Sequence, residues 1–166
     1  MNLEFGSEYD EFTSEVEAFC KEYSGATITT NDEKFEMHDA LSGNVSSSKG
    51  KSVGRSEWQK ILIEKGYFAR SIPKEYGGHG GEPDIIKSRI IAGAFAKYKV
   101  PNAMGGQGID MLVPTLLEWG TEDQKQQHIE STLLGETIWC QGYSEPNAGS
   151  DLASLQTKGE LIDGNW

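Results

Sequence analysis

The stretch CQGYSEPNAGSDLASLQT, residues 140–157, turns abruptly from bulky to small side chains. An aromatic run ends at Tyr143, and the eight residues that follow contain almost no bulky side chain. Ser, Pro, Asn, Gly and Asp are typical of surface turns, so one interpretation is an ordinary turn. The other interpretation is a loop kept small so that a ligand can lie against its backbone.

The composition indicates a globular protein with one substantial core. The chain has 166 residues, of which 36% are hydrophobic and 25% charged, so we expect one domain, or one domain and a fragment. Its net charge of −11 disfavours nucleic acid and anionic membranes as partners. No apolar run reaches the roughly 18 residues of a membrane span, and the N-terminus is acidic, unlike a signal peptide. A cytoplasmic location is therefore expected.

Neither the cysteines nor the histidines indicate a metal site. Cys20 and Cys140 lie far apart and form no C-x-x-C pair, so both are expected to be reduced and buried. His38, His79 and His128 are scattered, without a partner at helical spacing or a nearby cysteine. We therefore expect no bound metal.

Helical periodicity dominates the first half of the chain. Apolar residues recur every three or four positions from Phe5 to Tyr23, which predicts an amphipathic helix closed by Gly25. The polar residues 26–54 predict a long loop, with a short helix around 35–41.

Three boundary signals divide the next part of the chain. Ser56 predicts the N-cap of a second helix that stops at Gly66. Pro83, within reach of the first helical position, predicts the start of a third helix that ends before Pro101. Between these two helices, the glycine run 77–81 matches no phosphate-binding pattern and predicts a flexible turn.

Two further helices are expected before residue 136. Apolar residues cover most of the circumference of residues 108–119, so this fourth helix should be the most buried element. Thr121 and Gln124 predict a capping box that opens a fifth helix, which runs to Leu134 and is closed by Gly135.

From residue 136 onward the pattern indicates strands. Residues 136–143 are β-branched and aromatic, residues 152–161 could form a second strand, and Asp163–Gly164 predicts a tight hairpin turn. We expect an all-helical domain over 1–135 and the beginning of a β domain over 136–166. Since an isolated hairpin cannot bury its own face, the chain is expected to be truncated.

The residues GTEDQKQQHIESTLLGETIWCQGYSEPNAGSDLASLQT (120–157), preceded by KGYFARSIPKEYGGHG (65–80), closely resemble the N-terminal half of acyl-CoA dehydrogenases. The resemblance implies a mainly α chain, with the family's N-terminal helical bundle followed by the first strands of an incomplete β domain. It also implies an FAD enzyme that desaturates acyl-CoA between the α and β carbons. By this resemblance the loop is small because a flavin lies against its backbone.

The resemblance also implies the site residues of this loop. The Ser144 hydroxyl would contact the flavin ring, Gly149 would let the main chain approach it, and Ser150 would contact both cofactor and acyl-CoA. The implied cofactor-binding set is Gln141, Gly142, Tyr143, Ser144, Gly149 and Ser150. For the two serines, a purely turn-stabilising role is the alternative.

No catalytic residue is expected within this chain. In the family the base that removes the α-proton is a glutamate of the C-terminal half, and Glu145 is a structural loop residue. Asp151 is expected to cap the turn before Leu152. Trp139 and Tyr143 are expected to pack against the helices, although Tyr143 adjoins the site.

The resemblance extends to the partners. It implies an acyl-CoA substrate, electron-transfer flavoprotein as electron acceptor, and a homo-oligomer, either a dimer or a tetramer. The alternative function is a non-catalytic helical interaction module without flavin. The residues do not indicate which acyl group would be bound.

Overall fold

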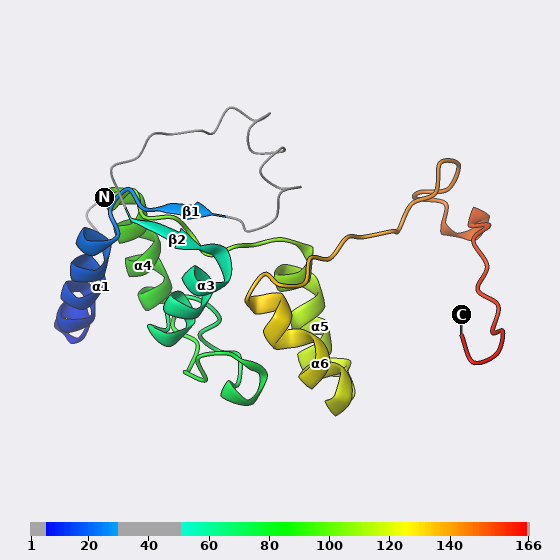
Figure 1. The fold of residues 1–166 in the computed structure, drawn as a ribbon, viewed down its shortest axis with the longest axis horizontal. Helices are drawn as coiled ribbons and strands as arrows, with labels where there is room; N and C mark the ends of the chain where they lie inside the picture. Colours follow the sequence, from blue (N-terminus) through cyan, green and yellow to red (C-terminus); the bar gives the residue numbers. More distant parts are fainter. Residues whose placement is uncertain (1–5, 30–50, 166) are drawn as a thin grey trace.

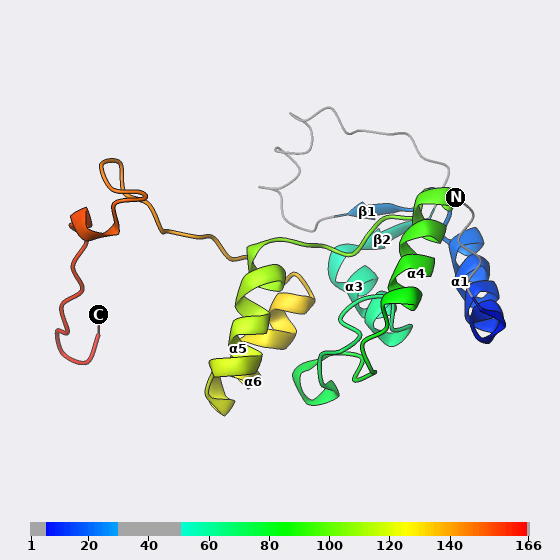
Figure 2. The same ribbon diagram turned by 180° about the vertical axis from the view of Figure 1, so that it is seen from behind.

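The computed structural model describes residues 6–29 and 51–165, and it is mainly helical, as predicted. We call residues 6–29 and 51–135 the helical body and residues 136–165 the C-terminal segment. In Figures 1 and 2, α1, α3 and α4 lie together, α5 and α6 lie beside one another, and the C-terminal segment leads away from the helices. The elements of the helical body are α1 (Asp10–Glu22), β1 (Thr27–Thr29), β2 (Ser52–Gly54), α3 (Arg55–Glu64), α4 (Ile85–Tyr98), α5 (Val113–Trp119) and α6 (Glu122–Leu133).

The first core lies between α1, α3 and α4 and is built around Phe19. The Phe19 ring stacks on Trp58 at 5.9 Å and on Phe95 at 6.0 Å between ring centroids, and meets Tyr67 edge-on at 5.1 Å. Such aromatic pairs stabilise a core beyond the burial of apolar surface. The amphipathic helix predicted near the N-terminus is confirmed as α1, which begins at Asp10 after a short 3-10 turn at Ser7–Tyr9.

The second core joins α6 to α5 and to the 3-10 turn Lys74–Tyr76. Ile129 and Leu133 of α6 are completely buried, and Val113 and Tyr76 pack with them. The start of α6 is fixed as predicted, because Thr121 and Gln124 form the reciprocal bonds of a capping box.

Gln59 links α3 to the end of α6 and to the chain that precedes the π-helical turn at Gly108–Leu112. Its side chain is fully buried. Its Nε2 donates to the carbonyl of Leu133 at 2.9 Å, and its Oε1 accepts from the amide of Met104 at 2.9 Å. A buried amide is stable only when its polar atoms are bonded, so Gln59 is a polar crosslink between the two cores.

The predicted loop over residues 26–54 is wrong at both of its ends. β1 and β2 form a parallel pair in which Thr27 lies opposite Ser52 and Thr29 opposite Gly54. Three-residue strands are too short for a periodicity signal, although β1 consists of β-branched residues. The helix predicted around residues 35–41 falls outside the described residues.

The starts of α3 and α4 also differ from prediction. β2 runs directly into α3, so Gly54 occupies the N-cap and Ser56 lies inside the helix. At α4 the N-cap is Asp84, whose Oδ1 accepts from the amides of Ile86 and Lys87, both at 2.9 Å. Pro83 therefore precedes the helix. The bond from the Lys87 amide is the main cause that lowers the pKa of Asp84.

The predicted fourth helix is formed over its whole length, but it is not the most buried element. Residues Gly108–Leu112 form a π-helical turn, and α5 begins at Val113. Met111 is 45% exposed and Trp119 is 78% exposed. The reason is that α5 packs against α6 on one side.

The strands predicted after residue 135 are not formed in the C-terminal segment. Within residues 136–165 the backbone pairs only in two isolated bridges, Glu145 with Ala148 and Ile162 with Asn165. A strand needs a neighbouring strand for its backbone bonds, and these residues have none. The tight turn is nevertheless confirmed, since Asp163 and Gly164 both have positive φ between the bridged residues.

Candidate functional site

The C-terminal segment begins by folding back over the end of α6. Gly135 ends the helix with a φ of +70°, which glycine adopts without strain. The amides of Glu136 and Thr137 then both donate to the carbonyl of Ser131, at 2.9 and 3.1 Å. These bonds direct the next residues along the side of α6.

Trp139 anchors the segment to the helical body, as predicted for its packing. Its indole Nε1 donates to Thr132 Oγ1 at 2.9 Å, and its ring lies edge-on to His128 at 5.4 Å. A Cβ added to Gly108 would lie 2.6 Å from Trp139 Cδ1, so only glycine allows this close contact. The π-helical turn and α6 are thus joined through one indole ring.

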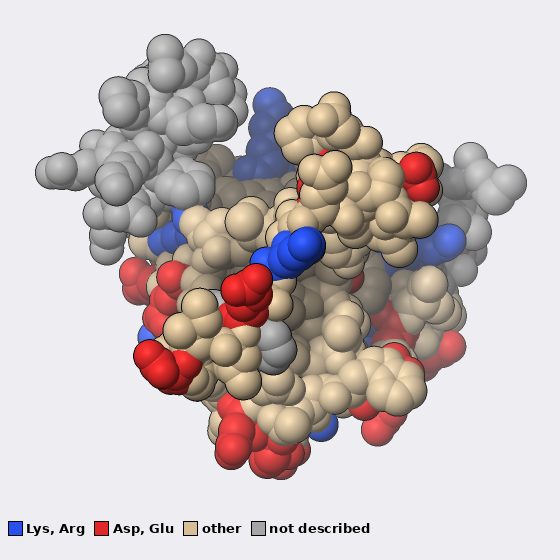
Figure 3. Space-filling view, turned by 90° about the vertical axis from the view of Figure 1, so that its right-hand side faces the viewer, with Lys and Arg blue, Asp and Glu red and all other residues tan. Residues whose placement is uncertain are grey.

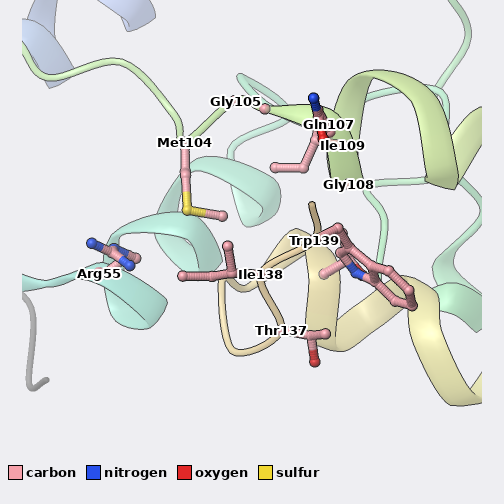
Figure 4. A pocket seen from close by; sticks show the side chains of 11 residues that line it. Arg55, Met104, Gly105, Gln107, Gly108, Ile109, Thr137, Ile138 and Trp139 are labelled. Atoms are coloured by element: carbon pink, nitrogen blue, oxygen red, sulfur yellow. The ribbon is translucent and has the colours of Figure 1, made fainter. Parts of the chain in front are cut away.

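Two pockets lie beside Trp139. The inner pocket, of about 250 Å³, is shown in Figure 4. Its lining combines apolar and polar residues: Arg55, Met104, Gly105, Gly106, Gln107, Gly108, Ile109, Thr132, Thr137, Ile138 and Trp139. The outer pocket, of about 300 Å³, is defined by Gln107, Met111, Thr115, Trp139, Gln141 and Tyr143. Gln107 and Trp139 contribute to the lining of both.

The outer pocket brings part of the predicted flavin segment to α5. Gln107 Nε2 donates to Gln141 Oε1 at 3.4 Å, and Gln141 Nε2 lies 3.9 Å from Met111 Sδ. Gly142 and Tyr143 follow along the same wall. Tyr143 is 73% exposed, so its predicted packing against the helices is wrong. Cys140 is also exposed, contrary to prediction, because only one side of this segment faces the helices.

Glu145 closes the loop that follows. Its carboxylate accepts from the amides of Gln156 and Thr157, at 2.9 and 2.7 Å, and from the Thr157 hydroxyl. The hydroxyl bond is the main cause that lowers the pKa of Glu145. Its backbone also bonds Ala148 in both directions. Glu145 therefore has a structural contact in the loop.

Asp151 does not cap the turn with its side chain, contrary to prediction. Its backbone carbonyl accepts from the Ser154 hydroxyl at 2.9 Å and from the Ser154 amide at 3.2 Å, and the side chain makes no cap bond. The hydrogen bonds of this turn therefore involve the backbone carbonyl of Asp151 and not its carboxylate.

The donors of residues 141–150 fit the polar edge of a flavin. A Cβ on Gly142 would meet nothing within 4 Å, and one on Gly149 would meet only Ser144 Oγ at 3.9 Å. A planar ligand could therefore approach this backbone closely. Serine hydroxyls and backbone amides also match the oxygen and nitrogen acceptors of an isoalloxazine ring.

The structure brings half of the predicted flavin set to the outer pocket. Gln141, Gly142 and Tyr143 line the outer pocket, whereas the other three belong to the segment 144–150, which leads away from the helices (Figure 1). The cofactor role of all six residues stays a prediction. Sequence reasoning missed Gln107 and Met111, and the signal that could have found them is the glycine-rich stretch 105–108 before the apolar residues of the fourth helix.

The glycine run 77–81 is braced rather than flexible, so that prediction is wrong. The amides of Gly78, His79 and Gly80 donate to the carbonyls of Pro73, Ala69 and Ile72, at 3.1, 3.1 and 2.8 Å. His79 Nδ1 also lies 3.0 Å from the Ile63 carbonyl. Because these donors are already bonded, the run cannot cradle a phosphate.

Within residues 6–29 and 51–165, no three histidine, cysteine or acidic side chains are grouped as metal ligands. No helix in the same described ranges is long and apolar enough to cross a membrane.

Figure 3, which views the molecule from the side of the C-terminal segment, shows acidic side chains along the lower edge of that face.

Comparison with known proteins gives a consistent result. Residues 7–136 match the family profile described as acyl-CoA dehydrogenase, N-terminal domain. The acyl-CoA dehydrogenase IpdE1 of Mycolicibacterium smegmatis is 36% identical over 108 residues, 65% of this chain and 27% of that protein. The acyl-CoA dehydrogenase FadE26 of Mycobacterium tuberculosis is 28% identical over 95% of this chain and 36% of its own length.

A solved structure shares the fold. The ChsE4-ChsE5 complex from Mycobacterium tuberculosis matches with a TM-score of 0.52 and 27% identity, over 95% of this chain and 36% of that one. The chain thus spans about a third of the length of these relatives, or less.

Proposed function

Because the chain belongs to the acyl-CoA dehydrogenase family, we propose that it supplies the N-terminal helical domain and one edge of the active site of an FAD-dependent acyl-CoA dehydrogenase. The reaction would be desaturation of an acyl-CoA thioester between the α and β carbons. The observation that carries the proposal is the outer pocket, where residues 141–143 meet Met111 and Leu112 of the π-helical turn and Thr115 of α5.

The wall of the outer pocket has two chemical halves that suit this reaction. Met111 and the Trp139 ring give an apolar surface from which an acyl group would exclude water. Gln141 and the backbone of Gly142 give donors that would hold the polar edge of the flavin. FAD, when bound, supplies the acceptor for the β-hydrogen.

The three remaining predicted residues, Ser144, Gly149 and Ser150, would complete the flavin contact. Glu145 holds its end of this loop closed through Gln156 and Thr157. The loop therefore has a defined shape before a ligand arrives, which lowers the entropic cost of ordering it on binding.

The base that removes the α-proton would come from outside the described residues. Glu145 adjoins the proposed flavin contact, but its carboxylate is bonded and its pKa is lowered, so it is a weak proton acceptor. The Asp110 carboxylate also has a partner, because it accepts from the Gly106 amide at 3.0 Å.

The partners of the intact enzyme would follow the family. An acyl-CoA substrate, electron-transfer flavoprotein as acceptor and a homo-oligomer, either a dimer or a tetramer, are part of the proposal. Assembly with a second subunit has one further support, since the similar structure is a complex of two proteins, ChsE4 and ChsE5. A cytoplasmic location rests on the sequence alone.

A titration of the isotope-labelled 166-residue chain tests the proposal. Adding FAD should shift the amide NMR signals of Gly142, Ser144 and Ser150, because these donors would meet the flavin edge. Adding octanoyl-CoA should shift the Met111 methyl signal, whereas free coenzyme A should leave that signal unchanged. We expect weak binding of both ligands, since this chain would supply only one edge of the site.

The same sample separates the two candidate functions. Shifts confined to residues outside 139–150, or no shift at all, would contradict the flavin site and favour a non-catalytic helical interaction module. An electron-acceptor assay with the chain alone should read zero. Measurable turnover would overturn the assignment of the base to a region outside this chain.

A further inference from the structure

Trp139 lies between the inner and the outer pocket. Together with Gln107 it lines both the inner and the outer pocket. The indole reaches from the C-terminal segment to α6, as Figure 4 shows, where Thr132 accepts its N–H and His128 lies against its ring. The ring is therefore held in place by a hydrogen bond and by packing, rather than placed loosely at the surface.

The position of the ring depends on two small contacts. A Cβ at Gly108 would collide with Trp139 Cδ1 at 2.6 Å and with Thr132 Cγ2 at 2.8 Å. Thr132 is itself oriented, because its hydroxyl donates to the His128 carbonyl at 2.6 Å. One glycine and one threonine thus fix the plane in which the indole divides the space.

The inner pocket suits an apolar group. Met104, Ile109 and Ile138 supply aliphatic and thioether surface around it. Its backbone is glycine-rich at residues 105–108, which widens the space beside these side chains. Arg55 and Thr137 add polar groups to the lining, so a pocket of about 250 Å³ with these walls could take a branched or ring-bearing hydrocarbon group against its apolar side.

We propose that Trp139 is a specificity-determining residue, whose indole confines a bound acyl group to the outer pocket and excludes wide acyl groups that would need the inner pocket as well. This inference rests on the proposed function. It predicts that, once the indole is removed, the inner pocket binds the wide apolar part of an acyl-CoA.

The chain carries a methionine in each pocket, which provides the test. Met104 lines the inner pocket and Met111 the outer one, so selective methyl labelling gives one NMR reporter for each. The probes are octanoyl-CoA, which is linear, and adamantaneacetyl-CoA, which is wide. In the unaltered chain, octanoyl-CoA should move the Met111 signal and leave the Met104 signal in place.

The variant Trp139→Ala should change the pattern. Adamantaneacetyl-CoA should now move both methionine signals, and its affinity relative to octanoyl-CoA should rise about tenfold or more, the usual scale for apolar pocket discrimination. If the Met111 signal responds but the Met104 signal and the affinity ratio stay unchanged, the partition is refuted while the proposed function stands.

Free indole makes the test independent of acyl-CoA binding. It should bind Trp139→Ala in the vacated space, move both methionine signals and leave the unaltered chain unaffected. Absence of that response overturns the partition even if no acyl-CoA binds, and absence of any Met111 response to acyl-CoA counts against the proposed function alone.

Two further variants guard against a folding defect. Trp139→Leu keeps apolar cover but is too short to bridge both walls, so it should reproduce the change in affinity ratio. Trp119→Ala removes the same side chain from a position that is 78% exposed and outside both pockets, and it should behave as the unaltered chain. Circular dichroism should show unchanged helix content in each.

Discussion

Leu133 in the helical body is completely buried, whereas Leu161 in the C-terminal segment is 60% exposed. Both regions contain apolar side chains, so composition does not distinguish them. The difference is in their partners: α6 packs on α5 and on the turn at Tyr76, while residues 152–165 meet no second layer among the described residues. Burial in this molecule therefore follows the availability of a facing element.

The backbone explains why one region is ordered by itself and the other only locally. A helix forms its hydrogen bonds within its own residues, so α1 to α6 need neighbours only for their side chains. A strand needs a second strand for both backbone and side chains. In the C-terminal segment the hydrogen bonds are local to the segment, such as those of the Glu145 carboxylate and of the turn at Asp163.

The largest expected contrast between the two regions is in thiol reactivity. Burial raises the pKa of Cys20 to about 11, which lowers its thiolate fraction by roughly two orders of magnitude relative to a free cysteine. Cys140 is exposed. A thiol reagent should label Cys140 at least a hundredfold faster, as followed by mass spectrometry of the digested chain. Equal labelling rates without denaturant would break the contrast.

A matched pair of leucines measures the same contrast in stability. Leu133→Ala should lower the free energy of unfolding of the helical body by about 2–5 kcal/mol, because it leaves a cavity against Ile129 and Val113. Leu161→Ala should change it by less than about 0.5 kcal/mol. Urea denaturation followed by circular dichroism measures both. A similar effect of the two variants would mean that the C-terminal segment has a core of its own.

The buried crosslink gives a smaller effect within the helical body. Gln59→Leu keeps the volume but leaves the Met104 amide and the Leu133 carbonyl without partners, at a cost of about 1–3 kcal/mol. Gln127→Leu, on the exposed side of α6, is the control. If the two variants unfold at the same urea concentration, the link between the cores through Gln59 contributes nothing.

The substitution expected to change the free energy of unfolding least is at Glu145. Glu145→Gln should speed amide hydrogen exchange at Gln156 and Thr157 and leave helix unfolding unchanged, whereas Glu160→Gln should alter neither. The pKa of Glu145 is lowered in the folded loop, so the contact is fully present above the ordinary glutamate pKa and is lost as pH falls through the lowered value. The measured quantity is the protection factor of these two amides, which is the exchange rate corrected for its intrinsic pH dependence. A protection factor that stays constant over this pH range would contradict the contact.

The sequence predicted helices better than their ends or their surroundings. The amphipathic pattern behind α1 and the capping box of α6 are local signals, and both are confirmed. β1 and β2 were missed because their pairing joins residues 27–29 to 52–54, which no local window contains. Asp84 was missed because Pro83 offered a competing start signal one residue earlier.

Only the part of the candidate site that consists of small loop residues could be predicted from the sequence. The run from Ser144 to Asp151 pointed to a loop with an accessible backbone, whereas the outer pocket depends on Gln107 and Met111, thirty residues or more before it. Their contribution follows from the way the C-terminal segment folds back along α6 and α5. That path is set by Gly135 and Trp139, and it is a property of packing, which periodicity does not encode.

The π-helical turn at Gly108–Leu112 allows the number of residues before α5 to change. Its hydrogen-bonded ring encloses one residue more than an α-helical ring. An α-helix could therefore take its place by losing a single residue, with Val113 still facing α6. The turn is thus a site where the number of residues between the glycine run and α5 can change without rearranging the second core. A deletion there would instead move Gln107 and Met111 relative to each other, and so alter the shape of the site while preserving the fold.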